Sequence, residues 1–86
     1  MSMEKRPHSE ILGKPVVTKE GRRLGTVRDI TFETRTGELI HILLREPTPY
    51  SQQLNLERSR QNEIMVPYNS IVAIGDFVVV SEEDLT

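Results

Sequence analysis

Short apolar runs, separated by turns that contain glycine, dominate the first half of the chain. Residues 15–18, about 24–34 and 39–45 are rich in Val, Ile, Leu, Thr and Phe, which favour strands. Residues 19–22 and 35–38 lie between these runs, and the glycine in each supplies the positive φ that a tight reversal often needs. The pattern therefore predicts three strands joined by two short turns.

The second of these strands has a break in its side-chain alternation. Leu24, Ile30 and Phe32 fall on one face of an ideal strand, whereas Val27 falls on the other. A one-residue bulge between Val27 and Ile30 would turn all four side chains inward, because an inserted residue reverses the alternation. A strand bent in this way suits a small barrel better than a flat sheet.

The third strand is apolar on both faces. Ile40, Ile42 and Leu44 share one face and are predicted to lie in the core. The other face carries Leu39, His41 and Leu43, which is too apolar for a surface that only meets water. Either the chain itself covers this second face, or a partner protein does.

Residues 47–63 form a polar insertion with two prolines at its start. Residues 51–60 are predicted either as a short helix or as an irregular loop. In the helical alternative, Ser51 is the N-cap and Leu54 and Leu56 are the apolar anchors.

The segment "VPYNSIVAIGDFVVV", residues 66–80, is apolar but is interrupted at short intervals. Pro67 has no N–H to donate and is predicted to end a strand, and residues 68–71 favour a single turn. Residues 72–74 resume as a short strand, and Gly75 with Asp76 reverses the chain into another. These interruptions are interpreted as corners that curl short strands around a small core.

Together the segments predict an all-β fold. We expect a small antiparallel β-barrel, closed or partly open, of about six short strands, with the short helix of the insertion as its only candidate helix. The barrel domain is predicted to span residues 11–81, between an N-terminal tail of residues 1–10 and a C-terminal tail of residues 82–86.

Composition narrows the classes of function. A chain of 86 residues is expected to form one domain. It contains no cysteine, which excludes disulfides, thiolate metal sites and cysteine nucleophiles and fits a cytoplasmic location. No apolar run approaches the roughly 20 residues that span a bilayer, so no transmembrane segment is predicted.

Charge is divided unevenly along the chain, although the net charge is only −2. Lys19, Arg22 and Arg23 cluster at the first turn and are a candidate contact for RNA phosphates or anionic headgroups. The second half of the chain is acidic, and an overall negative protein gains little from neutralising phosphate. Nucleic acid is therefore not the expected partner.

Catalytic chemistry has few candidate residues. The two histidines are His8, in the N-terminal tail, and His41, in the third strand, and no nucleophile with a base and an orienting group is evident. Two histidines without cysteine do not suggest a zinc site, and the acidic residues 82–84 are interpreted as solvating the C-terminus. No catalytic, cofactor-binding or metal-binding residue is predicted, and the chain is not expected to be an enzyme.

Two stretches of the sequence resemble the PRC-barrel family. They are "LGKPVVTKEGRRLGTVRDI", residues 12–30, and "VPYNSIVAIGDFVVV", residues 66–80, which is similar to the closing stretch of that family. With the third strand between them, the resemblance covers most of residues 11–81. It implies a small β-barrel fold and no shared catalytic motif.

The resemblance also implies a function. This compact format looks most like stand-alone archaeal PRC-barrel proteins implicated in cell division, adaptors that bind each other and a SepF-type membrane anchor of FtsZ. We therefore expect a homodimer, or a heterodimer with a paralogue, recruited to the division site. The alternative is a module associated with RNA and ribosome maturation, as in another branch of the family. The expected partner-contact residues are Leu39, His41, Leu43, Tyr50, Leu54 and Leu56.

Overall fold

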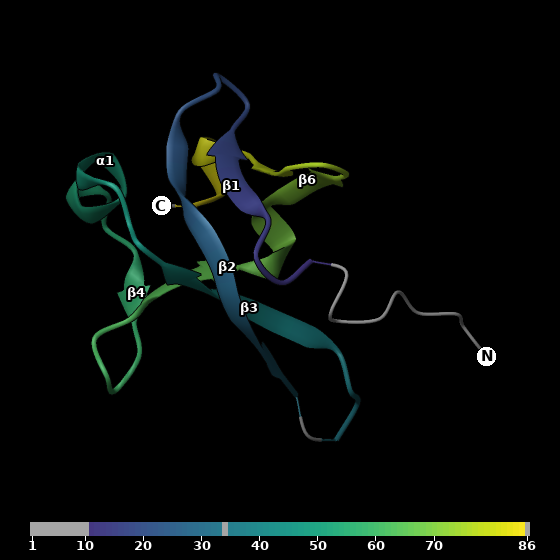
Figure 1. Cartoon of the computed structure of the whole chain (residues 1–86). Coiled ribbons are helices and arrows are strands. Elements are labelled where there is room, and N and C mark those ends of the chain that lie inside the picture. Colours follow the sequence, from purple (N-terminus) through teal and green to yellow (C-terminus); the bar gives the residue numbers. More distant parts are fainter. Residues whose placement is uncertain (1–10, 34, 86) are drawn as a thin grey trace.

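Seven short strands form one sheet in the computed structural model of the chain, which describes residues 11–33 and 35–85 (Figure 1). The strands are β1 (Pro15–Thr18), β2 (Arg23–Phe32), β3 (Leu39–Arg45), β4 (Glu57–Arg58), β5 (Ile64–Pro67), β6 (Ile71–Ile74) and β7 (Val78–Val80). The helical elements in this part of the chain are α1 (Pro49–Gln53) and the 3₁₀ turns η2 (Tyr68–Ser70) and η3 (Glu82–Asp84). The predicted all-β class is thus confirmed.

The order of the strands leaves the barrel partly open. The sheet runs β4-β5-β3-β2-β1-β7-β6, so β4 and β6 are its two edges. All neighbouring strands are antiparallel except β1 and β7, which run parallel. The sequence predicted about six antiparallel strands. The additional strand is the two-residue β4, and the parallel pair joins segments too far apart in sequence for a local pattern to reveal.

The predicted bulge in β2 is present. The pairing of β2 with β3 shifts between Val27, which pairs with Leu44, and Asp29, which pairs with Leu43. Arg28 is therefore the extra residue, and it is exposed. Because of this shift, Val27 is buried in the core with Ile30.

Gly25 marks the place where β2 passes closest to another part of the chain. A Cβ atom built on Gly25 would lie 2.9 Å from the carbonyl oxygen of Arg45. The chain after β3 is fastened to β2 beside this contact, because the Thr48 amide donates to the Leu24 carbonyl at 3.0 Å. The Thr48 hydroxyl also donates to the Arg23 carbonyl at 2.7 Å. Only glycine leaves room for this approach.

One apolar core lies inside the curved sheet. Its buried members come from both ends of the described chain and from β1, β2, β3, β5 and β7: Ile11, Val16, Leu24, Val27, Ile30, Ile42, Leu44, Ile64, Val66, Val78, Val80 and Leu85. The predicted core positions Ile42 and Leu44 are among them. Leu85, in the segment predicted as a C-terminal tail, is only 6% exposed. η3 folds back and returns this leucine to the core.

The insertion contains a helix, but not where the sequence placed it. α1 starts at Pro49, and its N-cap is Thr48, whose side chain accepts a hydrogen bond from the Ser51 amide at 3.2 Å. The prediction of Ser51 as N-cap of a helix over residues 51–60 was wrong. Proline is favoured in the first turn of a helix, where its missing N–H costs nothing, and the residue before it becomes the cap. Glu57 and Arg58 instead form β4.

The corners predicted after residue 66 are all present. β5 ends at Pro67, η2 provides the single turn, and β6 and β7 follow as an antiparallel pair around the turn that contains Gly75. This arrangement brings β7 beside β1, where Val16 pairs with Val78 and both side chains are fully buried. In the described residues, no helix is both long and apolar enough to cross a bilayer.

Candidate interaction surfaces

In the outward row predicted on β3, the chain itself covers Leu43. Leu43 is 9% exposed although it does not belong to the core cluster, so the chain itself covers this position. It pairs with Asp29 on β2 and with Met65 on β5, and β3 is thus an interior strand of the sheet. The side chain of Leu39 lies outside the described residues. Of the two alternatives for this face of β3, cover by the chain itself thus holds at Leu43.

His41 has a partner within the chain. Its Nε2 atom lies 3.1 Å from a carboxylate oxygen of Glu57 on β4, and the Glu57 side chain is largely exposed. The imidazole is half-buried and contacts the exposed edge strand of the sheet. No three His, Asp or Glu side chains gather into a metal-binding group within the described ranges.

The predicted contact residues of the insertion lie around α1 and β4. Tyr50, Leu54 and Leu56 are half-buried and pack against the core, so each presents part of its side chain to solvent. We name these three residues the α1 surface. It lies on the side of the molecule where α1 and β4 are seen in Figure 1.

Tyr50 also belongs to a polar contact between three distant segments. Its hydroxyl donates a hydrogen bond to the carboxylate of Glu82 in η3. The guanidinium carbon of Arg22 lies 4.8 Å from the centre of the Tyr50 ring, a cation–π distance. The hydrogen bond to Glu82, with a smaller contribution from burial, raises the pKa of Tyr50 above its ordinary value.

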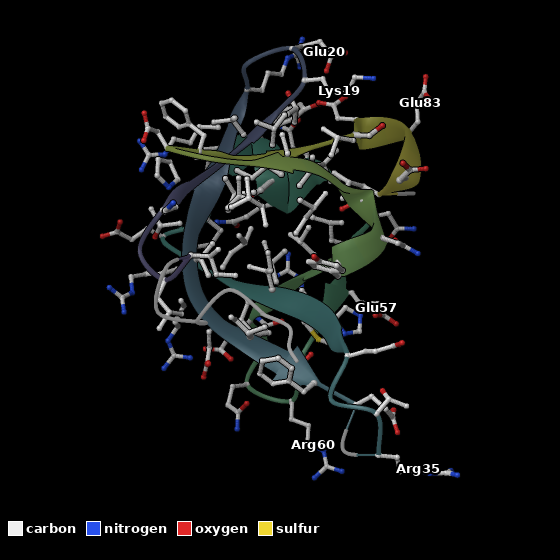
Figure 2. All side chains as sticks on the ribbon, turned by 90° about the vertical axis from the view of Figure 1, so that its right-hand side faces the viewer. Lys19, Glu20, Arg35, Glu57, Arg60 and Glu83 are labelled. Carbon is white, nitrogen blue, oxygen red and sulfur yellow. The ribbon has the colours of Figure 1, made fainter. Side chains whose placement is uncertain are left out.

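The basic turn predicted to contact phosphate carries charges of both signs around it. Lys19, Arg22 and Arg23 are all exposed, but Arg22 is engaged by Tyr50. The Lys19 amide donates to the Val80 carbonyl at 3.0 Å, close to the acidic η3. Figure 2 shows Lys19, Glu20 and Glu83 at the same end of the molecule. Mixed charges of this kind weaken the attraction for a polyanion.

An exposed apolar surface that the sequence did not single out surrounds β6. Within the described ranges, four large hydrophobic residues are exposed: Leu12, Tyr68, Val72 and Phe77. Their exposed fractions lie between 41% and 53%. We name these four residues the β6 surface. Val72 lies in β6, Tyr68 precedes the strand in η2, and Phe77 follows its turn.

Leu12 is placed in the same region by Lys14, which lies two residues further along the chain. The ammonium group of Lys14 donates a hydrogen bond to the carbonyl oxygen of Gly75, in the turn between β6 and β7. Residues 11–14 therefore lie on the β6 side of the molecule, as Figure 1 also shows. The β6 surface was missed because the sequence pattern marks these residues as apolar but does not say which strand has an unpaired edge.

The comparisons with known proteins agree with this fold. The chain matches the PRC-barrel domain family over residues 3–85. It is also similar to an uncharacterized protein of Methanocaldococcus jannaschii, with 31% identity over 83 residues that cover 96% of this chain and 89% of that protein. PRC-barrel domains are binding and interaction modules and are not typically enzymes. The chain, which folds as a partly open barrel, therefore belongs to the PRC-barrel domain family.

Proposed function

We propose that this chain is a non-enzymatic adaptor of archaeal cell division, which dimerises and binds a SepF-type anchor of FtsZ. The observation that carries the proposal is the set of apolar side chains left accessible on the domain. The β6 surface and the half-buried α1 surface both offer apolar contact area on a domain of a binding family. The similarity to an archaeal protein supports the setting.

The α1 surface is the proposed site for the SepF-type partner. Tyr50, Leu54 and Leu56 keep one part of each side chain in the core and present the rest outward, so they are held in fixed positions before any partner arrives. Contacts that are ordered in advance lose less conformational entropy on binding. The aromatic ring of Tyr50, already oriented by Glu82 and Arg22, is the anchor of this surface.

Titration of the purified chain with a purified archaeal SepF-type protein tests this function. Saturable binding is expected for the wild type, and Leu56→Glu should weaken it at least tenfold, because the new carboxylate would be desolvated in the contact. Circular dichroism must show that Leu56→Glu is folded. Val72→Asp, on the other side of the molecule, is the matched control and should bind as the wild type does.

Two results would count against the proposal. Absence of binding by the wild type at high micromolar concentration would remove the SepF-type partner. Unchanged binding by a folded Leu56→Glu variant would remove the α1 surface as its site.

A further inference from the structure

The two edges of the sheet are built differently. β4 has only two residues, Glu57 and Arg58, and both are charged and exposed. Short charged strands of this kind are a common protection against pairing with another chain. β6 has four residues, "IVAI", without a charge or a proline, and Val72 and Ala73 are exposed. One edge of the sheet is therefore protected and the other is not.

The β6 edge has specific requirements for an occupant. Within the part of the chain that the structure describes, β7 is the one strand that pairs with β6, so the other side of β6 is an open edge of this sheet. The chain that pairs with it must be short, extended, uncharged and apolar on the side that meets Val72. β6 of a second copy meets each of these requirements, and opposing two identical uncharged strands brings no like charges together.

Charge at the two ends of β6 selects the direction of this pairing. The turn end carries Lys14 and Asp76, which are opposite in sign. The first residue of β6, at the other end, directly follows η2. η2 contacts the acidic η3, in which Glu83 and Asp84 are exposed. Antiparallel pairing places the acidic end of one copy beside the mixed end of the other. Parallel pairing would bring the two acidic ends together.

We propose that two copies of this chain pair through β6, antiparallel and about a two-fold axis, to give one sheet across β7-β6-β6-β7. The pairing rests on the proposed function, since it names the surface by which the adaptor dimerises. Val72 lies in the pairing strand itself, and the exposed Tyr68 and Phe77 come shortly before and after that strand in the chain. A contact made by one short hairpin falls below the roughly 800 Å² per partner of a standard interface, so the dimer is weak and concentration-dependent.

Light scattering after size exclusion tests the dimer and its surface. The wild type should shift from monomer to dimer as the concentration rises into the hundreds of micromolar, and Val72→Asp should remain a monomer throughout. Gln61→Asp is the matched control, because it adds the same carboxylate at an exposed position away from β6 and should dimerise as the wild type does. A wild type that stays monomeric, or a folded Val72→Asp that still dimerises, overturns the proposal.

Cross-linking provides a test that tolerates an unstable Val72→Asp variant. The chain contains no cysteine, so a single introduced thiol reports on a symmetric contact without interference. At least one of Val72→Cys and Ala73→Cys should give a disulfide-linked dimer on mild oxidation, because residues near a two-fold axis of paired strands approach within the distance of a disulfide. Arg60→Cys should not. Equal cross-linking at residue 60 and at β6 overturns the proposal.

The two proposals can fail separately. A Val72→Asp monomer that still binds the SepF-type protein supports the β6 contact and the partner site together. A dimer through β6 without partner binding sinks the proposed division role and leaves the β6 pairing intact.

Discussion

The hydroxyl of Tyr50 in α1 donates a hydrogen bond to the carboxylate of Glu82 in η3. This bond joins the inserted helix to the last turn of the described chain, and Arg22 lies over the same ring from the β1–β2 turn. Three segments that are separate in the sequence, the insertion, the residues after β7 and the β1–β2 turn, are thus one structural unit. Tyr50 itself packs against the core, and Leu85, which directly follows η3, lies in it.

Alkaline pH should weaken this unit. The pKa of Tyr50 is raised in the folded chain, so the folded state holds the phenol proton more tightly than the unfolded state does. The stabilisation is present below the unfolded value of about 10 and is lost as the pH rises through the higher folded value. Urea unfolding at a pH below and a pH above this window should show a decrease in the free energy of unfolding of the wild type. Tyr50→Phe should not show this decrease.

An absorbance titration isolates the same group. The chain has two tyrosines, so Tyr50 is the only one in a Tyr68→Phe background. Glu82→Gln should lower the pKa of Tyr50 in that background, because the hydrogen bond to the Glu82 carboxylate is the main cause of the rise. An unchanged titration in Glu82→Gln would contradict the assigned bond.

Leu85→Ala should destabilise the fold although Leu85 lies at the end of the described chain. Its side chain is buried in the core, and truncation of a buried leucine costs about 2–4 kcal/mol through lost transfer energy and the cavity left behind. Leu12→Ala is the matched control, since Leu12 is exposed and should change the unfolding free energy by only about 0.5 kcal/mol. Urea denaturation of the two variants decides the point, and similar effects would mean that Leu85 is not a core residue.

Leu43→Glu should unfold the chain rather than only detach a partner. Leu43 is buried inside the sheet, and an unpaired carboxylate there is expected to cost about 3–5 kcal/mol, a large part of the stability of a domain of this size. Leu43→Met keeps the volume and the apolar character and should cost less than about 1.5 kcal/mol. Thermal unfolding followed by circular dichroism compares them. A fully stable Leu43→Glu would show that this face of β3 is open after all.

Gly25→Ala should lower the free energy of unfolding by about 1–3 kcal/mol, because the added methyl group would lie 2.9 Å from the Arg45 carbonyl oxygen. Neither backbone can move away without disturbing the β2–β3 pairing. At Gly75 an added Cβ has no heavy atom within 4 Å, so Gly75→Ala should be close to neutral. Chemical denaturation of both variants measures the difference, and equal unfolding free energies would contradict the close approach at Gly25.

Features determined within a few residues could be predicted from the sequence. The bulge between Val27 and Ile30 follows from the two-residue period of a strand, and the corners after Val66 follow from the backbone limits of proline and glycine. The start of α1 carried a local signal as well. Pro49 suits the first turn of a helix, which makes Thr48 rather than Ser51 the natural cap.

Features determined by distant pairing could not be predicted in the same way. Side-chain alternation told which face of β3 Leu43 occupies, but not that the chain itself buries that face. The same limit applies to Val72, whose exposure depends on β6 being an edge strand. The position of a strand in a sheet depends on all its partners, and no short window of sequence contains them.

The parallel pairing of β1 with β7 has a consequence for synthesis in the cell. Val16 leaves the ribosome well before Val78, so the two can meet only after all the residues between them have been made. Contacts between such distant segments slow folding, because a long loop must close before they contribute. The nascent chain can therefore form the β2–β3 hairpin before β7 has been made, but it can complete its barrel only after β7 has emerged, and its apolar strands stay exposed to chaperones until then.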